Sequence, residues 1–141
     1  MNDSWHIRGP NVRVRIEGDI VVVQSFGVTT LDDMKLIFEA YAMVRRAHPT
    51  LFALYDSRYS KGVTSEARKA IVNANSHAET TDAAAVFGAP FAMRALVNML
   101  DRASMFLRGR PLGVAMFATE SEARNYLEQQ RFRLSSNHMH L

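Results

Sequence analysis

Hydrophobic and polar residues alternate with a period of two near the start of the chain. Along residues 12–17 valine or isoleucine alternates with a charged residue, which predicts a strand with one face toward solvent. Gly18 and Asp19 then predict a two-residue hairpin turn, because glycine accepts the positive φ that such turns require. Residues 20–23 are β-branched and apolar at every position, so they predict an interior strand.

Four later segments carry the capping residues and the period of helices. Thr30 and Asp33 have the spacing of an N-cap and its return bond, and Pro49 ends a helix predicted to reach about His48. The other predicted helices run from residues 64–66 to about His77, from about 90 to 107, and from a capping box at 119–122 to about Phe132.

Three apolar segments between these helices, residues 51–55, 83–87 and 113–117, predict strands. The resulting order ββαβαβαβα predicts an α/β domain with a mixed five-stranded sheet and four helices. A chain of 141 residues with no repeat or linker suits one domain. We therefore predict a single domain over residues 1–141, with its core at about 10–132 and a tail at 134–141.

Two predicted helices carry apolar residues over a wider arc than a helix lying on a sheet needs. A first stripe on each helix would face the sheet, and a second stripe lies beside it. The alternatives for the wide arc are packing between neighbouring helices, a homodimer surface, or a cleft for an apolar ligand between the first and third helices. The first stripes are Met34, Ile37, Phe38, Tyr41 and Val44, and Met93, Leu96, Val97, Leu100, Ala103 and Leu107.

The second stripes and a neighbouring cation define the predicted interface or ligand surface: Leu36, Met43, Arg94, Met99 and Phe106. On the third helix we place the polar residues, Arg94, Asn98, Asp101 and Arg108, on the side opposite the first stripe.

Charge changes this picture only locally. The net charge is +3, and residues 89–113 alone hold four arginines against one aspartate. Arginine suits phosphate or carboxylate recognition, and beside an apolar surface it suits an acyl or lipid-like anion or the rim of an interface. No basic–aromatic interleaving or nucleic-acid motif occurs, so we predict no nucleic acid partner.

Candidate chemistry is sparse. The chain has no cysteine, and its five histidines are scattered without metal-ligand spacing. No nucleophile elbow, P-loop or dinucleotide fingerprint occurs, so we predict a non-enzymatic protein without metal or cofactor. Asp56, Ser57 and Arg58 follow a strand, where open α/β sheets place their sites; the alternative is a turn in which Asp56 accepts loop N–H groups. Without a signal peptide or spanning segment, we predict a cytoplasmic protein with at most peripheral membrane contact.

Several segments resemble the STAS domain (sulfate transporter and anti-sigma-factor antagonist), and more closely its bacterial SpoIIAA-like relatives. They are the strand at residues 20–23, residues 54–56, residues 64–68 and above all residues 116–127, which are similar to the F-A-T-E-x-E-A-x-x-W/Y-L ending of SpoIIAA-like proteins. The resemblance covers residues 10–132. It implies a (βα) superhelical sheet, shared with the lipid-binding CRAL-TRIO/SEC14 domains, and no particular reaction.

Regulatory STAS domains are phosphorylated on a serine in an Asp-Ser-Ser-Gly motif at the start of the second helix. By that resemblance the acceptor position falls on Ser65, with Thr64 beside it. Val63 and Glu66 depart from the motif, and a carboxylate next to the serine would repel phosphate. The alternative is that Thr64 or Ser65 is simply the helix N-cap.

Together these observations favour a regulatory or protein-interaction domain that forms a homodimer and binds a protein partner of kinase-like or sigma-regulatory type. The alternative is a carrier or sensor of a small apolar or amphipathic, lipid-like ligand.

Overall fold

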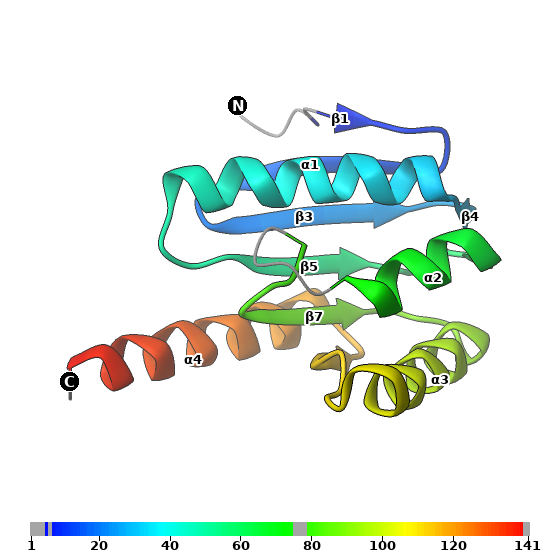
Figure 1. Cartoon of the computed structure of the whole chain (residues 1–141). Helices are drawn as coiled ribbons and strands as arrows, with labels where there is room; N and C mark the ends of the chain where they lie inside the picture. The colour runs from blue at the N-terminus through cyan, green and yellow to red at the C-terminus, as the bar shows by residue number, and fades with distance from the viewer. Residues whose placement is uncertain (1–4, 6, 75–78, 140–141) are drawn as a thin grey trace.

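A mixed β-sheet with helices on both faces organises the protein (Figure 1). The computed structural model describes residue 5, residues 7–74 and residues 79–139. Its strands are β1 Ile7–Arg8, β2 Val12–Glu17, β3 Ile20–Ser25, β4 Val28–Thr29, β5 Phe52–Asp56, β6 Gly62–Val63, β7 Ala83–Phe87 and β8 Val114–Phe117. Its helices are α1 Leu31–Ala47, α2 Ser65–Asn73, α3 Phe91–Arg108 and α4 Glu120–Met139.

The main sheet has the strand order β1-β2-β3-β5-β7-β8. The strands β1, β2 and β3 are antiparallel, whereas β3, β5, β7 and β8 run parallel to one another. All the parallel strands therefore end at one edge, which we call the carboxyl edge. A separate parallel pair, β4 with β6, lies in the connections that leave this edge.

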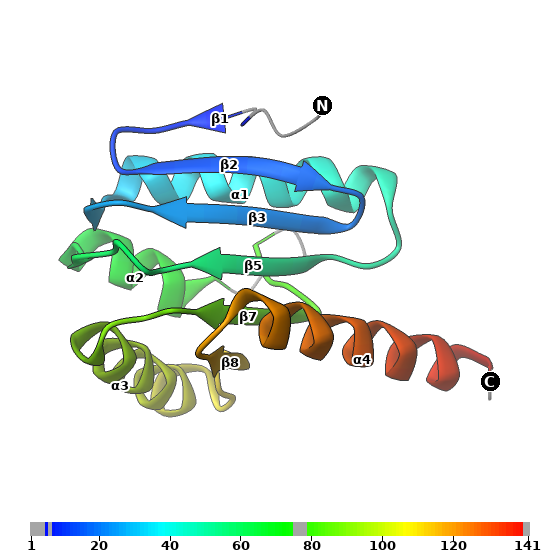
Figure 2. The same ribbon diagram turned by 180° about the vertical axis from the view of Figure 1, so that it is seen from behind.

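Alternate residues of each strand pack into two cores on opposite faces of the sheet. Val21 and Val23 pack with α1, α2 and α3 on one face, which we call the cleft face. Val22 and Leu54 pack against Leu127 of α4 on the other face, which we call the α4 face. Figure 2, seen from behind, shows the first turns of α4 in front of β7. The all-apolar run of β3 is thereby explained, since both of its faces are buried.

Local capping signals have set three of the helix starts. Asp33 accepts hydrogen bonds from the backbone N–H and hydroxyl of Thr30, and the Thr30 hydroxyl accepts one from the Asp33 N–H. Thr119 and Glu122 form the same reciprocal box before α4. Thr64 caps α2 through the backbone N–H of Ala67.

The α/β class, the four helices and the order of the predicted strands are confirmed. The prediction of five strands in the sheet is wrong, because β1 adds a sixth by pairing with β2 through Ile7 and Val14. The prediction of a tail from residue 134 is also wrong for residues 134–139, because α4 continues to Met139. Helix α2 ends at Asn73, and the predicted end near His77 lies outside the described residues.

Candidate functional site

An apolar cleft of about 320 Å³ lies on the cleft face between α1 and α3. The buried side of α1 contributes Met34 and Phe38, α3 contributes Leu96 and Leu100, and Ala84 of β7 forms part of the floor. The two helices are thus too far apart to close completely over the sheet. A cleft between the first and third helices is one of the alternatives that the wide apolar arcs predict.

Two tyrosines form a polar point in this apolar lining. The hydroxyl groups of Tyr41, from α1, and Tyr55, from β5, hydrogen-bond to each other, and both side chains line the cleft. Burial raises the pKa of Tyr55 and raises that of Tyr41 more strongly. Both phenols therefore stay protonated at neutral pH, and one hydroxyl hydrogen of the pair is left for a further partner.

The two buried side-chain polar atoms that lack a hydrogen-bond partner in the described part of the chain belong to residues that line this same cleft. They are Oγ of Ser60 and Nε of Arg108. The Arg108 side chain is held by a hydrogen bond from its Nη1 to the carbonyl oxygen of Ala74. A buried polar atom without a partner costs free energy, so native proteins keep few of them outside functional sites.

Arg110 lines the cleft beside Arg108. Burial and the positive charge of Arg110 lower the pKa of Arg108 from its ordinary value. Glu79 also lines the cleft, but among the described residues neither arginine forms an ion pair with it or with another carboxylate. This end of the cleft is therefore positively charged.

The placement of Arg108 corrects the expectation that it lies opposite the first stripe of α3. Arg108 follows Val97 by about three helical turns, so the two residues share a side of the helix. That spacing is the signal in the sequence that identifies Arg108 as a cleft residue. Leu107, expected in the buried stripe, is 64% exposed because it falls in the last turn of α3, past the packed part of the helix.

The five residues predicted as an interface or ligand surface lie outside the cleft lining. Leu36 is partly buried and lies beside Gly9, whereas Met43 and Arg94 are exposed. Met99 and Phe106 are exposed on the outer side of α3, Phe106 to 87%. A role for these residues in a homodimer stays a prediction.

The side chain of Asp56 is fully engaged at the carboxyl edge. It accepts hydrogen bonds from Nε and Nη2 of Arg58, at 3.0 and 2.8 Å, and from Nε2 of Gln24 at 3.0 Å. It also accepts the backbone N–H of Arg58, as the turn interpretation expects. Burial alone would raise the pKa of Asp56, but these bonds outweigh it and the pKa is lowered. Ser57 is buried, with its N–H bonded to the carbonyl oxygen of Phe87.

Thr64 and Ser65 have different surroundings. The hydroxyl of Thr64 is used by the cap, whereas Ser65 is the first residue of α2 and is exposed. Of the two predicted acceptor positions, Ser65 is the accessible one, and phosphorylation there stays a prediction.

Four exposed apolar side chains lie in the segments that follow β3, β5 and β7 at the carboxyl edge. They are Phe26, Val28, Tyr59 and Phe91, which we call the carboxyl-edge patch. The segments that carry them are neighbours, because Val28 pairs with Gly62, and residues on both sides of Phe91 line a shallow hollow with residues 60–62. Neither periodicity nor motif signalled this patch, because its members come from three segments that are separate in the sequence.

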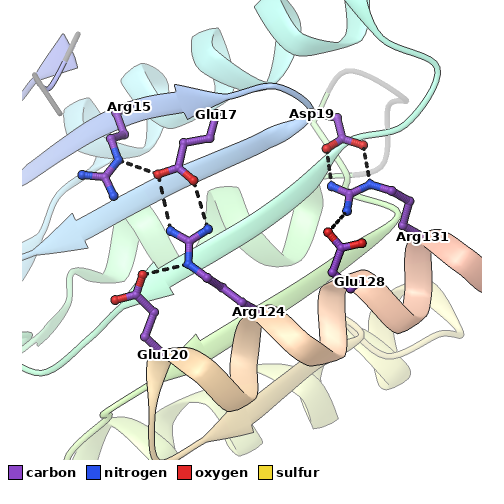
Figure 3. Close-up of polar contacts among 7 residues, drawn as sticks. All are labelled: Arg15, Glu17, Asp19, Glu120, Arg124, Glu128 and Arg131. Atoms are coloured by element: carbon purple, nitrogen blue, oxygen red, sulfur yellow. Dashed lines mark hydrogen bonds and ion pairs between the residues drawn. The ribbon is translucent and has the colours of Figure 1, made fainter. Parts of the chain in front are cut away.

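The α4 face has charged groups of a different kind, in two clusters that join α4 to the β2–β3 hairpin (Figure 3). Arg124 donates to Glu17 from Nη1, at 3.0 Å, and to Glu120 from Nε, at 2.8 Å. Arg131 pairs with both carboxylate oxygens of Asp19.

The Arg131 guanidinium also lies over the ring of Phe52, with its central carbon 5.1 Å from the ring centroid. We call the two clusters the α4 latch. In each of them an arginine of α4, Arg124 or Arg131, has a carboxylate partner on the β2–β3 hairpin.

Two kinds of feature are absent from the described ranges. No group of three or more histidine, aspartate or glutamate side chains is placed to hold a metal ion. None of the helices is both long enough and apolar enough to cross a membrane.

Comparison with known proteins connects this chain to solved structures through its fold. One is the anti-sigma factor antagonist SpoIIAA in its unphosphorylated form, with 12% identity and a TM-score of 0.54 over 83% of this chain and 97% of that one. Another is an uncharacterised DUF3478-family protein with a SpoIIAA-like fold from Shewanella loihica PV-4, with 15% identity and a TM-score of 0.55 over 88% and 98%. No protein-family model and no curated protein matches the sequence. The structural likenesses confirm the SpoIIAA-like fold that the sequence predicts.

Proposed function

We propose that this chain is a non-enzymatic regulatory domain that binds a protein partner through the carboxyl-edge patch. The observation that carries the proposal is the exposure of four large apolar side chains at one edge, with the accessible Ser65 on the adjacent helix start. Large exposed apolar side chains on one edge of a small domain are typical of interaction surfaces. The likeness to an anti-sigma factor antagonist supports a regulatory role.

Quantitative affinity purification from the native host tests this proposal. Phe91→Ser and Tyr59→Ser should each remove the same partner that wild-type protein retains. Phe132→Ser is the matched control, because Phe132 is a comparably exposed aromatic on α4. A set of bound proteins that is the same for all four proteins would contradict the proposal.

The same purification examines the predicted switch at Ser65. If phosphorylation there controls the contact, Ser65→Ala should keep the partner and Ser65→Asp should lose it, because a charge is added at the edge of the patch. Equal retention by both variants would remove Ser65 from the proposal and leave the patch itself in place.

The cleft supports a second candidate function, the binding of a small apolar or amphipathic ligand. The specific observation concerns the two buried side-chain polar atoms of the described residues that lack a hydrogen-bond partner. Both belong to residues that line this one apolar cleft. Its volume of about 320 Å³ lies at the lower end of the ~300–1,000 Å³ typical of small-molecule sites.

Calorimetric titration with dodecanol, a neutral single-chain probe, tests this second candidate. Wild-type protein should bind dodecanol, and Val97→Trp, which fills the cleft, should abolish binding. Ala95→Trp places the same bulk on the exposed side of α3 and should bind as wild type does. Absence of dodecanol binding to wild-type protein, or unchanged binding to Val97→Trp, would contradict it.

A further inference from the structure

The charged end of the cleft narrows the class of ligand that the cleft accepts. The inference rests on the second candidate function above and concerns the chemistry of its ligand. Three observations carry it: the place of Arg108 in the cleft, the absence of a counter-charge, and the shape and volume of the apolar part.

Arg108 is held at the C-terminal end of α3, where the cleft meets the end of α2. Its Nη1 is bound to the carbonyl oxygen of Ala74, which fixes the guanidinium in place. A guanidinium has five N–H donors, and this one has a single hydrogen bond to the described residues. Its remaining donors match the two oxygens of a carboxylate in geometry.

No described carboxylate forms an ion pair with the charge at this point. The neighbouring Arg110 adds a second positive charge, and no carboxylate among the described residues pairs with either arginine. A partly desolvated guanidinium without a counter-charge is unfavourable, and a bound anion removes that cost. By contrast, the arginines of the α4 latch all have carboxylate partners.

The rest of the cleft is mainly apolar, and its polar groups include the Tyr41–Tyr55 hydroxyl pair and Glu79. The apolar residues that α1 and α3 contribute are Met34, Ile37, Phe38, Met93, Leu96, Val97 and Leu100. A volume of about 320 Å³ accommodates one alkyl chain and is too small for the two chains of a membrane phospholipid.

We propose that the cleft binds an alkyl chain with a single terminal carboxylate, and that Arg108, assisted by Arg110, holds the carboxylate. The chain then lies between α1 and α3 on the floor formed by β5 and β7. Two kinds of ligand share this chemistry. One is a free carboxylic acid, and the other is an acyl chain attached to a group that itself ends in a carboxylate.

Calorimetric titration with dodecanoate, below its micelle concentration, tests the proposal. Wild-type protein should bind dodecanoate more tightly than dodecanol. Arg108→Gln should weaken dodecanoate about ten- to a hundredfold, because a hydrogen-bonded charge pair is lost, and should leave dodecanol binding unchanged. Arg110→Gln, an exposed position that is safe for folding, should weaken dodecanoate about two- to fivefold.

Two controls test whether binding depends on the position of the arginine and on a single alkyl chain. Arg102→Gln removes an exposed charge from the outer side of α3 and should bind dodecanoate as wild type does. Dihexanoyl phosphatidic acid, whose two short chains together have as many acyl carbons as dodecanoate, should not compete with dodecanoate.

The outcomes separate the two proposals. If wild type binds both probes but neither Arg108→Gln nor Arg110→Gln discriminates against dodecanoate, the carboxylate anchor is overturned and the apolar ligand site stands. If the two-chain lipid competes, the single-chain inference is overturned. If wild type binds neither probe, the ligand site and the anchor fall together.

Discussion

The arginines of α4 and those at the end of α3, on opposite faces of the sheet, have different surroundings. On the α4 face, Arg124 and Arg131 each reach a carboxylate of the β2–β3 hairpin. On the cleft face, Arg108 and Arg110 lie together without a carboxylate partner among the described residues, although the neighbouring lining is apolar. Paired charges hold elements together, whereas an unpaired charge beside a cleft is available to a ligand. The comparison therefore separates arginines that stabilise the fold from arginines that serve binding.

Replacement of Arg131 should lower the stability of the protein more than the other arginine replacements do. Arg131→Met leaves Asp19, whose side chain is only 15% exposed, without its bidentate partner, and it uncovers the Phe52 ring. We expect the free energy of unfolding to fall by about 2 kcal/mol. Urea unfolding followed by circular dichroism measures the change. A loss no larger than that of Arg133→Met, an exposed control on the same helix, would contradict the structural role.

Arg124→Met should have a smaller effect, because both partners in the Arg124–Glu17 pair are about one-third exposed and solvent screens the pair. We expect a loss of about 1 kcal/mol in the same urea experiment. A loss of stability equal to that of Arg131→Met would show that the burial of the ion pair does not determine how much each cluster of the α4 latch stabilises the fold.

Acid should weaken the latch in a defined direction. Burial alone would raise the pKa of Glu17 and of Asp19, but hydrogen bonds from arginine outweigh it, so both lie below their ordinary values of 4.5 and 3.8. The folded state therefore gains stability from these groups above pH 4.5. That gain is lost as the pH falls through the lowered values.

The measurement is urea unfolding at a series of pH values. Arg131→Met should show a smaller loss of stability on acidification than wild type does, because Asp19 loses the arginine that contributes most to lowering its pKa. A steeper loss in the variant would contradict the assignment.

Arg108→Met should be the mildest of the arginine replacements in the ligand-free protein. The substitution removes a hydrogen bond to Ala74 but also removes an unpaired, partly desolvated charge. These opposing effects should leave the free energy of unfolding within about 1 kcal/mol of wild type. A loss as large as that of Arg131→Met would mean that Arg108 is structural, and the contrast between the faces would fail.

Local signals in the sequence were sufficient for most of the fold. The capping pairs Thr30–Asp33 and Thr119–Glu122 lie within one helical turn, so short-range patterns locate those helix starts. The short strand β1 gave no such signal, because two residues are too few to show a period of two. Its extended conformation depends on pairing with β2. The end of α4 was missed because the helix as a whole shows little amphipathicity, so no periodic pattern marked where it stops.

The candidate site was only partly predictable. Helical periodicity placed Met34, Phe38, Leu96 and Leu100 on faces turned toward the sheet, and the structure brings these faces to one cleft. Periodicity shows on which side of a helix a residue lies, but it does not show which element faces that side. A second stripe that lies on the surface therefore could not be distinguished in the sequence from one that lines a cleft. Arg108 is held by the carbonyl oxygen of the distant residue Ala74, and no described carboxylate forms an ion pair with it; no local pattern encodes either fact.

Thermal unfolding with and without dodecanoate tests the contrast between the two faces most directly. A ligand that binds only the folded state raises Tm, so dodecanoate should raise the Tm of wild type and of Arg131→Met by similar amounts. It should raise the Tm of Arg108→Gln much less, because this variant binds dodecanoate more weakly. A rise in Arg108→Gln as large as that in wild type would contradict the assignment of the unpaired arginine to ligand binding.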